Sequence, residues 1–105
     1  MVIREGEIIM GVLYELNWYL VVGTENDLLE REIDCFVTTK SDKRFYPIGA
    51  PIPLIVKSIG CMGMVEVTSF KVDSQSTTIE FVFTEHYEPD NVIAMHYFSQ
   101  YKAGK

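Results

Sequence analysis

The side chains in this sequence that are best suited to chemistry are its two cysteines and two histidines. Thiolate and imidazole groups are the ligands that zinc and related metals prefer. Structural zinc sites usually take such ligands from close pairs on a turn, but the four residues here are widely separated: Cys35, Cys61, His86 and His96. The spacing therefore favours buried thiols and surface imidazoles, and we expect neither a bound metal nor another cofactor.

One of the cysteines has a setting that would also suit a nucleophile. Cys61 lies between Gly60 and Gly63, where backbone N–H groups would form an anion-binding concavity, and His86 or His96 would act as the base. A β-bulge explains the two glycines equally well. One cysteine and two candidate bases are too few residues to define a catalytic site, so we assign no catalytic residue. Whether the protein is an enzyme stays open, and we favour a protein that is not an enzyme.

Arg44 is the cation that we consider for an anionic ligand, because two aromatic residues, Phe45 and Tyr46, follow it directly. A surface ion pair or a stacking contact is the more common role for such an arginine. Trp18 would pack in the core, or else line a pocket with the tyrosines near it. If the protein binds a ligand, the residues that we expect to contact it are Arg44, Tyr46, Cys61 and His86.

Charge narrows the range of partners. The 105 residues include 15 acidic and 9 basic side chains, which give a formal net charge of −6. Such a charge repels nucleic acid and anionic membranes at long range, and the basic residues are scattered along the sequence. We therefore expect no nucleic-acid partner and no membrane partner.

The composition is that of a single globular domain. A hydrophobic fraction of 48% over this length is enough for a core that needs no disulfide or metal to stabilise it. We see no secretory signal and no stretch long enough for a membrane helix, so we expect a cytoplasmic protein with unbridged cysteines. Within the domain we expect a mobile or edge-strand lead over residues 1–9, a β core over 10–87 and a C-terminal extension over 88–105, with Met10 as an alternative original start.

The elements that must position these residues are mainly strands. Three of the four prolines interrupt the apolar stretch 44–57. No helix can cross this stretch, because each proline restricts its own backbone dihedral angles and those of the residue before it. Elsewhere apolar residues alternate with period two, which predicts strands. The expected strands cover residues 12–22, 33–40, 52–58, 64–72 and 77–87, and a four-residue hairpin loop joins the last two.

Several local features add detail. The apolar face of 64–72 changes parity across Thr68 and Ser69, which predicts a bulge there. The glycines in 60–63 fit a bulge or tight turn rather than a strand interior, and 28–32 would form a short helical or irregular turn. For 92–101 a short helix is favoured over a strand. Its cap would be Asp90 or Asn91, and its inner face would combine Ile93, His96 or Tyr97, and Gln100 or Tyr101.

Together these elements predict a mainly β fold, a small and strongly bent antiparallel sheet or a partly closed β-barrel of about five strands, with a short C-terminal helix. The motifs Met10-Gly11 with Glu15-Leu16-Asn17, Arg44-x-Tyr46-Pro47 with Pro51-Ile52, and Thr77-Thr78-Ile79 resemble a family of short, uncharacterised cytoplasmic proteins of Gram-positive bacteria, a domain of unknown function. The resemblance covers roughly residues 10–87. It implies no known activity and therefore no catalytic residue.

The chain is also similar, more distantly, to the RNA-associated β-barrels of the PUA and ASCH type. The segments that carry this similarity are Gly49-Ala50-Pro51, Leu54-Ile55-Val56 and Gly63-Met64-Val65-Glu66-Val67. It implies an RNA partner, which the acidic charge opposes.

Two classes of function remain. The first is a non-enzymatic binding or protein-interaction module with a protein or small-molecule partner. Such a module would form a homodimer through an edge strand or the aromatic C-terminal segment. It is favoured because no catalytic motif is recognised. The alternative is a small enzyme or ligand carrier with a pocket near Arg44, Cys61 and His86. A PUA- or ASCH-like RNA-associated domain is a further alternative.

Overall fold

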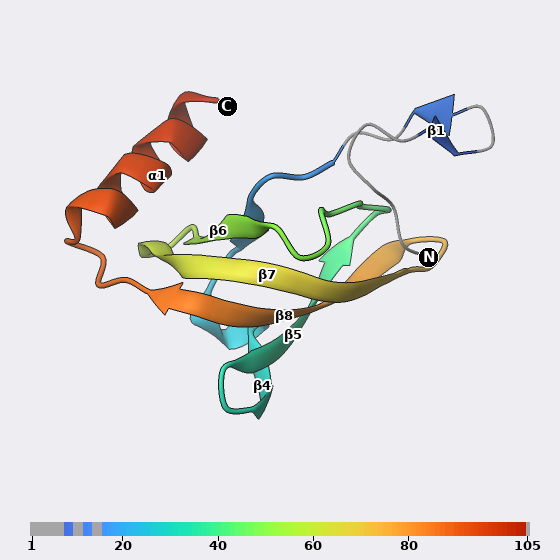
Figure 1. Cartoon of the computed structure of the whole chain (residues 1–105), viewed down its shortest axis with the longest axis horizontal. Helices are drawn as coiled ribbons and strands as arrows, with labels where there is room; N and C mark the ends of the chain where they lie inside the picture. The colour runs from blue at the N-terminus through green and yellow to red at the C-terminus, as the bar shows by residue number, and fades with distance from the viewer. Residues whose placement is uncertain (1–7, 10–11, 14–15, 105) are drawn as a thin grey trace.

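The computed structural model describes residues 8–9, 12–13 and 16–104, and its main body is a six-stranded sheet that curves into a half-barrel (Figure 1). The order of strands across the sheet is β3-β6-β7-β8-β5-β4. Neighbouring strands are antiparallel except β3 and β6, which run parallel. The mainly β fold class is confirmed, and the sheet is mixed because it contains this one parallel pair. The strands are β3 (Leu20–Val22), β4 (Leu29–Glu32), β5 (Cys35–Ser41), β6 (Pro51–Val56), β7 (Gly60–Val72) and β8 (Ser76–His86).

The centre of the sheet follows the period-two pattern of the sequence. The predicted strands 33–40, 52–58, 64–72 and 77–87 are confirmed as β5, β6, β7 and β8. The predicted bulge is also confirmed, because the pairing of β7 with β8 shifts between Val67 and Ser69. The shift brings Val65, Val67 and Phe70 into one buried cluster although their parity in the sequence differs. That cluster is completed by Leu20, Tyr46, Ile52, Leu54, Ile79 and Phe81.

The glycine-rich stretch 60–63 lies inside β7, so the expectation that it would not form a strand interior is wrong. The pairing with β6 shifts between Leu54 and Ile55, opposite Cys61 and Gly63, so the expected bulge is present. The ladder continues past the bulge, because Ile55 still pairs with Cys61 and Val56 with Gly60. β7 therefore extends over 13 residues.

The prediction of one long strand over residues 12–22 is wrong. Val12–Leu13 forms β2, which pairs with β1 (Ile8–Ile9) in a separate two-stranded sheet, and only Leu20–Val22 joins the main sheet. Between them, the backbone N–H and the side-chain Nδ2 of Asn17 both donate to Phe45 O, at 2.7 Å and 3.0 Å. These bonds attach the segment to the proline-rich stretch instead of to a strand.

Residues 29–32 form a strand, so the prediction of a helical or irregular turn over 28–32 is wrong. β4 pairs with β5 in a hairpin whose turn contains Asp34 at a φ of 62°. All four residues of β4 are exposed. A charged edge strand of this kind needs no apolar face, so its sequence lacks the alternation by which strands are recognised.

The open side of the half-barrel is bridged by contacts between β3 and β5. Lys40 Nζ donates to Val21 O on the edge of β3. Thr38 Oγ1 donates to Asp27 O at 2.8 Å, which attaches the 3₁₀ turn η1 (Glu25–Asp27) that follows β3. These bonds fix the position of Lys40 relative to β3, on the rim where the cleft described below lies.

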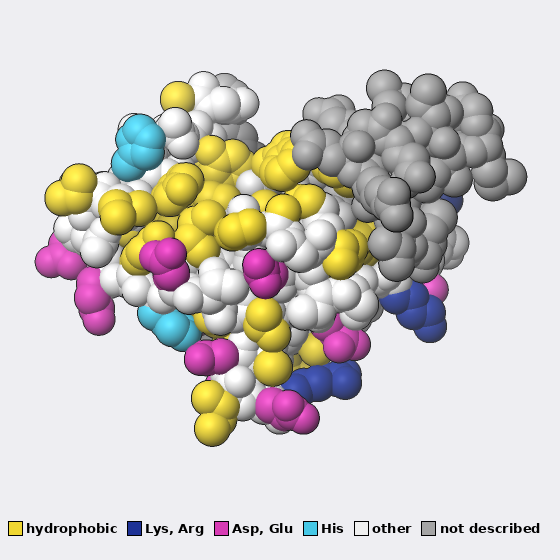
Figure 2. All heavy atoms as spheres, in the orientation of Figure 1, with side chains coloured by type: hydrophobic (Ala, Val, Ile, Leu, Met, Phe, Trp, Pro, Cys, Tyr) yellow, Lys and Arg dark blue, Asp and Glu magenta, His cyan; other side chains and the backbone are white. Residues whose placement is uncertain are grey.

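The predicted C-terminal helix is confirmed as α1 (Val92–Ala103). Asn91 is its cap, because its Oδ1 accepts from the N–H groups of Ile93 and Ala94 at 2.8 Å and 3.4 Å. The helix covers the sheet on the face opposite to the main core, where Ile55, Cys61 and Ala94 are buried among partly buried aromatic side chains: Tyr19, Tyr87, Tyr97, Phe98 and Tyr101. Figure 2 shows hydrophobic side chains gathered along the junction between α1 and the sheet.

The inner face of α1 differs in part from the prediction. Tyr97 and Tyr101 face the sheet as expected, whereas Ile93 is 51% exposed and Ala94 occupies the buried position. Within the described part of the chain, no helix is long and apolar enough to cross a membrane. The aromatic side chains of this segment pack against the sheet of their own chain, and a homodimer through them stays a prediction.

Candidate functional site

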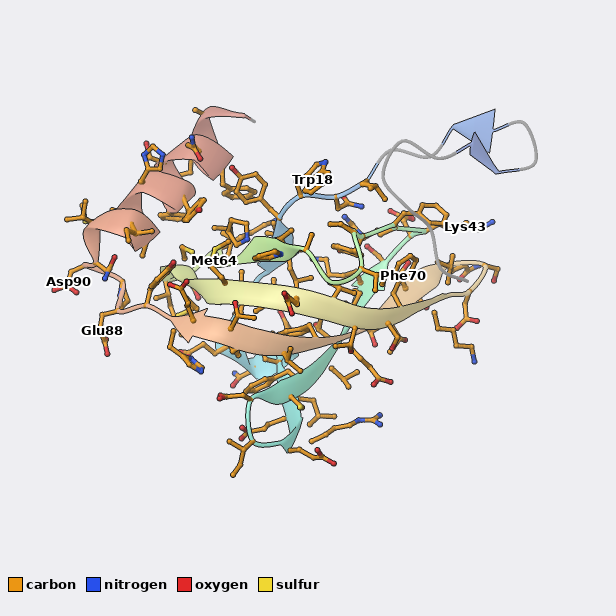
Figure 3. All side chains as sticks on the ribbon, in the orientation of Figure 1. Trp18, Lys43, Met64, Phe70, Glu88 and Asp90 are labelled. Atoms are coloured by element: carbon orange, nitrogen blue, oxygen red, sulfur yellow. The ribbon has the colours of Figure 1, made fainter. Side chains whose placement is uncertain are left out.

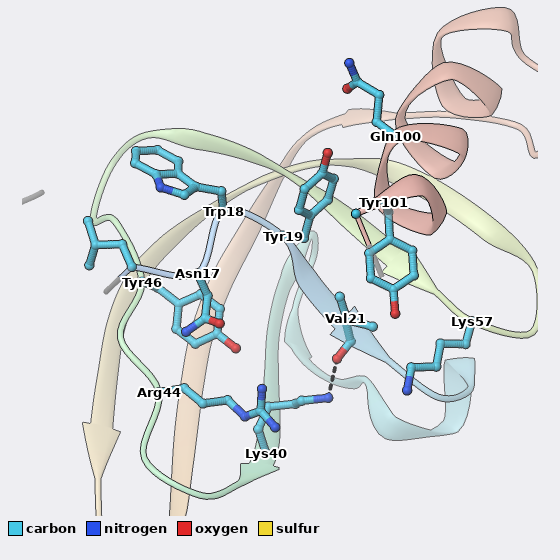
Figure 4. Close-up of a pocket in the computed structure, with 12 residues that line it drawn as sticks. Asn17, Trp18, Tyr19, Val21, Lys40, Arg44, Tyr46, Lys57, Gln100 and Tyr101 are labelled. Atoms are coloured by element: carbon cyan, nitrogen blue, oxygen red, sulfur yellow. Dashed lines mark hydrogen bonds between the residues drawn. The ribbon is translucent and has the colours of Figure 1, made fainter. Parts of the chain in front are cut away.

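A cleft of about 680 Å³ lies where the edge strand β3, the turn after β5 and the last turn of α1 meet (Figure 4). Sites for small ligands are typically about 300–1,000 Å³, so its size suits one. We call it the basic cleft. It is lined by Leu16, Asn17, Trp18, Tyr19, Val21, Lys40, Arg44, Tyr46, Lys57, Gln100, Tyr101 and Gly104.

The basic cleft gathers positive charge on an acidic protein. Three of the 9 basic residues in the sequence line it, namely Lys40, Arg44 and Lys57, and no aspartate or glutamate is among the described residues that line it. Each of the three comes from a different segment: the end of β5, the turn that follows it and the turn after β6. The charged side chains among the described lining residues therefore have the opposite sign to the net charge of −6.

Backbone and side-chain hydrogen bonds hold Arg44 in place. Its backbone N–H donates to Thr77 Oγ1 at 2.9 Å, and that hydroxyl donates to Asp42 O at 2.8 Å. Thr77 is fully buried in β8, so the turn is attached to the centre of the sheet. Arg44 Nε also donates to Ser41 O at 2.8 Å. The guanidinium is therefore oriented before any ligand arrives.

Lys57 is positioned by the parallel pair of strands. Its backbone N–H donates to Val22 O at 2.9 Å, which extends the pairing of β3 with β6 by one residue. The side chain then leaves the sheet at the end of this pair, and Figure 4 shows it on the opposite side of Val21 from Arg44.

Tyr46 joins the basic cleft to the core. Its side chain is 1% exposed, and its ring makes an edge-on contact with Phe70 at 6.2 Å between centroids. Burial raises the pKa of the Tyr46 phenol to about 12, against the opposing effect of the Arg44 charge. At neutral pH the phenol is therefore uncharged and leaves the positive charge of the cleft intact.

Aromatic side chains line the other end of the basic cleft. Trp18 is 41% exposed, so the expectation that it packs in the core is wrong and the alternative that it lines a pocket is correct. Figure 3 shows it directed away from the sheet. Tyr19 contacts Tyr101 of α1, with 5.8 Å between ring centroids. Figure 4 shows Trp18 and Tyr19 at one end of the cleft and Lys40 with Arg44 at the other.

The structure brings two of the four expected ligand-binding residues together. Arg44 and Tyr46 both line the basic cleft, whereas Cys61 and His86 do not. Cys61 is buried beneath α1. His86 lies at the end of β8, where its Nε2 is 2.9 Å from Asp34 Oδ1 and its ring stacks on Phe83. The expectation missed Lys40 and Lys57, which carry no local signal because both are ordinary lysines at strand ends.

The remaining metal-ligand candidates are also apart from the cleft. Cys35 is half-buried in β5 and His96 is exposed on α1. Across residues 8–9, 12–13 and 16–104, no three histidine, cysteine or acidic side chains are grouped in a way that could hold a metal ion.

Cys61 is expected to react with an alkylating reagent roughly tenfold more slowly than Cys35 in the folded protein. Both thiols are free, but Cys61 is 1% exposed, and burial raises its pKa against the smaller, opposing effect of a backbone hydrogen bond with Gly63. Mass spectrometry of digested, pulse-labelled protein would measure both rates. The variants Cys35→Ser and Cys61→Ser assign each signal, and equal rates in the wild type would contradict the burial of Cys61.

Comparison with known proteins supports the fold and assigns no activity. No family model matches the chain, and no curated protein matches it. Among solved structures, it is similar to the crystal structure of protein YtmB from Bacillus subtilis, a structural genomics target. The TM-score is 0.63 and the sequence identity is 23%, over 79% of this chain and 100% of the YtmB chain.

At this identity the likeness to YtmB shows a shared fold and nothing more. YtmB comes from a Gram-positive bacterium, and the resemblance of this chain to an uncharacterised Gram-positive family stays a prediction. The similarity to PUA- and ASCH-type barrels is not confirmed.

Proposed function

We propose that this protein is a non-enzymatic binding module and that it holds an anionic ligand in the basic cleft. The observation that carries the proposal is that basic side chains from separate segments, among them Arg44 and Lys57, line one cleft of an acidic protein. An anion bound in the cleft would compensate the like charges of Arg44 and Lys57.

The nature of the cations supports an anion with several oxygens. A guanidinium offers a planar fork of donors that matches carboxylate or phosphate, and lysine adds compact charge. A binding role is further supported by the positions of Cys61 and His86. An enzyme built on Arg44, Cys61 and His86 would need the three to converge, whereas Cys61 is buried beneath α1 and His86 lies beside Asp34.

We also infer a bacterial, cytoplasmic setting and a relationship to the uncharacterised Gram-positive family. The fold shared with YtmB and the motifs around Arg44 and Thr77 support the relationship. The two free cysteines support a reducing compartment.

Arg44→Ala is expected to weaken the binding of inorganic pyrophosphate by about tenfold to a hundredfold, because a charge-assisted hydrogen bond contributes roughly 1.5–3 kcal/mol. Isothermal titration calorimetry at low ionic strength would measure it, since salt screens such contacts. The backbone N–H that binds Thr77 remains in the variant, so the turn is expected to keep its shape.

Lys71→Ala is the matched control for this experiment. Lys71 has the same charge and is exposed on β7, outside the basic cleft. Its removal is expected to leave pyrophosphate affinity unchanged. No binding of pyrophosphate to the wild type, or equal losses in the two variants, would refute an anion site in the cleft.

A further inference from the structure

We propose that the outer face of α1 is the contact surface of a two-fold symmetric homodimer, in which the α1 helices of two copies of this chain pack antiparallel. This inference goes beyond the anion site and does not depend on it. It follows from three properties of the helix: the apolar side chains exposed at its start, the lack of charge along most of its length and the opposite charges at its two ends.

Exposed apolar side chains are concentrated at the start of α1. Among the described residues, six large apolar side chains are exposed, and three of them belong to the first turn of this helix. These are Val92, Ile93 and Met95, which are 81%, 51% and 57% exposed. The helix itself is held in place by its inner face, where Ala94 is fully buried against the sheet. A fixed helix with such a cluster on its outer side is typical of a surface that binds another molecule.

The outer side of α1 can be covered without burying a carboxylate, ammonium or guanidinium group. Val92, Met95 and Ser99 are exposed and recur at intervals of three and four residues, so they share one side of the helix. The stretch 92–101 contains no aspartate, glutamate, lysine or arginine, and its polar side chains other than tyrosine are those of His96, Ser99 and Gln100. A partner helix therefore meets little desolvation cost there.

The two ends of α1 have opposite charges. Glu88 and Asp90 are exposed just before the helix begins, and Figure 3 shows both at its start. Lys102 is exposed in the last turn, where its Nζ lies 4.6 Å from the centre of the Phe98 ring. In an antiparallel pair, the acidic start of each helix lies beside Lys102 of the other copy. The surface is therefore complementary to itself, as the contact of a two-fold dimer must be.

The packing along α1 also suits an antiparallel pair. A two-fold axis near the middle of the helix sets Met95 of one copy opposite Ser99 of the other, where a flexible side chain meets a small one. The helix has 12 residues and is about 18 Å long. A pair of such helices provides less than the roughly 1,200–2,000 Å² that stable interfaces bury. We therefore expect a reversible dimer that forms as the protein concentration rises.

Met95→Glu tests whether the outer face of α1 makes the contact. In sedimentation velocity between about 10 μM and about 1 mM, the average mass of the wild type is expected to rise from one chain toward two. The variant places a carboxylate in the contact and is expected to weaken the dimer about tenfold or more. Because Met95 is exposed in the single chain, the variant is expected to fold, which far-UV circular dichroism would check.

Ile33→Glu is the matched control. Ile33 is 90% exposed in the turn between β4 and β5, which Figure 1 shows far from α1. The variant gains the same negative charge as Met95→Glu and also replaces an exposed apolar side chain. It is expected to dimerise like the wild type.

Charge reversal tests the antiparallel arrangement. In about 150 mM salt, where long-range repulsion is screened, Asp90→Lys and Lys102→Asp are each expected to weaken the dimer about twofold to fivefold, as exposed ion pairs do. The double variant has the net charge of the wild type and again sets opposite charges beside each other. It is expected to recover the wild-type affinity. If Asp90→Lys strengthens the dimer instead, like charges meet in it and the antiparallel arrangement is wrong.

The remaining outcomes decide between this surface and its alternatives. A wild type that stays monomeric up to about 1 mM, or a dimer that Met95→Glu weakens no more than Ile33→Glu does, would overturn the proposal. Binding of the monomer to phosphatidylcholine vesicles, lost in Met95→Glu, would also overturn it, because the face would then be a lipid contact. Met95 does not line the basic cleft, so pyrophosphate is expected to bind Met95→Glu as it binds the wild type. Failure of the dimer and failure of the anion site are therefore separate results.

Discussion

Replacing Gly63 with alanine is expected to destabilise this protein more than any other single methyl group added to a glycine of its sheet. Gly63 lies in β7, where β8 passes so close that an added Cβ would be 2.1 Å from Glu85 O and 3.1 Å from Glu85 C. Both atoms belong to the backbone and cannot rotate away. The two strands must separate, and we expect a loss of about 3 kcal/mol or more, at the upper end of overpacking effects.

Gly49→Ala is the matched control. Gly49 has a φ of +77°, which is unfavourable for alanine, but among the described residues, apart from its two neighbours in the chain, no atom lies within 4 Å of the position of its Cβ. Its cost is therefore backbone strain alone, about 1 kcal/mol. Urea unfolding followed by far-UV circular dichroism would measure both variants. Equal losses would mean that the close approach of β7 and β8 at Gly63 is not a constraint on the fold.

The importance of Gly63 illustrates what sequence reasoning could reach. Two glycines three positions apart indicated an irregularity, and a bulge is present in the pairing of β6 with β7. The pattern did not indicate that β7 continues through it, because the reason lies in another strand. Only the position of Glu85 on β8 makes a side chain at Gly63 impossible.

The strands that were predicted correctly share one property, an apolar face repeated at period two and ended by turn residues. The hairpin of β7 and β8 has both, and the bulge near Thr68 followed from the change of parity. β4 was missed because all its residues are exposed, so no apolar face exists to be recognised. Its place in the sheet is decided by hydrogen bonds to β5.

The stretch 12–22 was wrongly predicted as one strand because it has the apolar alternation that β4 lacks. Its alternation is regular, yet Trp18 is exposed and Asn17 is bonded to Phe45 O. An alternating pattern of apolar residues indicates which side chains a segment would bury if it formed a strand. It does not indicate whether a neighbouring strand is available to pair with that segment. In the described part of this stretch, β6 offers such a partner only to Leu20–Val22.

The sequence predicted part of the candidate site. Arg44 and Tyr46 were chosen because a cation beside aromatic residues is a local signal. Lys40 and Lys57 have no such signal, since their meeting with Arg44 depends on the parallel pairing of β3 with β6 and on the curvature of the sheet. Cys61 and His86 were chosen for their chemistry alone, and the fold separates them from the cleft.

Tyr46→Ala is expected to have the second large effect on stability, a loss of about 3–5 kcal/mol as for other buried aromatic residues. The ring is 1% exposed and packs in the main core against Phe70. Tyr46→Phe is the matched control, because it keeps the ring and removes the hydroxyl, and it is expected to lose less than half as much. Chemical denaturation at pH 7 would compare the two. Similar losses would show that the hydroxyl, and not the ring, is what the core requires.

The same pair of variants tests the titration of Tyr46 at high pH. Its pKa in the folded protein is raised to about 12 by burial, above its ordinary value of 10.0, so folding favours the protonated phenol. The resulting stability is fully present below pH 10 and is lost as the pH rises from there toward 12, because only the unfolded chain releases the proton easily. Between pH 9 and pH 11 the wild type should therefore lose roughly 1 kcal/mol more unfolding free energy than Tyr46→Phe, whose side chain does not ionise. If both proteins lose stability in parallel, ionisation of Tyr46 is not coupled to unfolding, and its hydroxyl must then reach solvent through the cleft more freely than its burial implies.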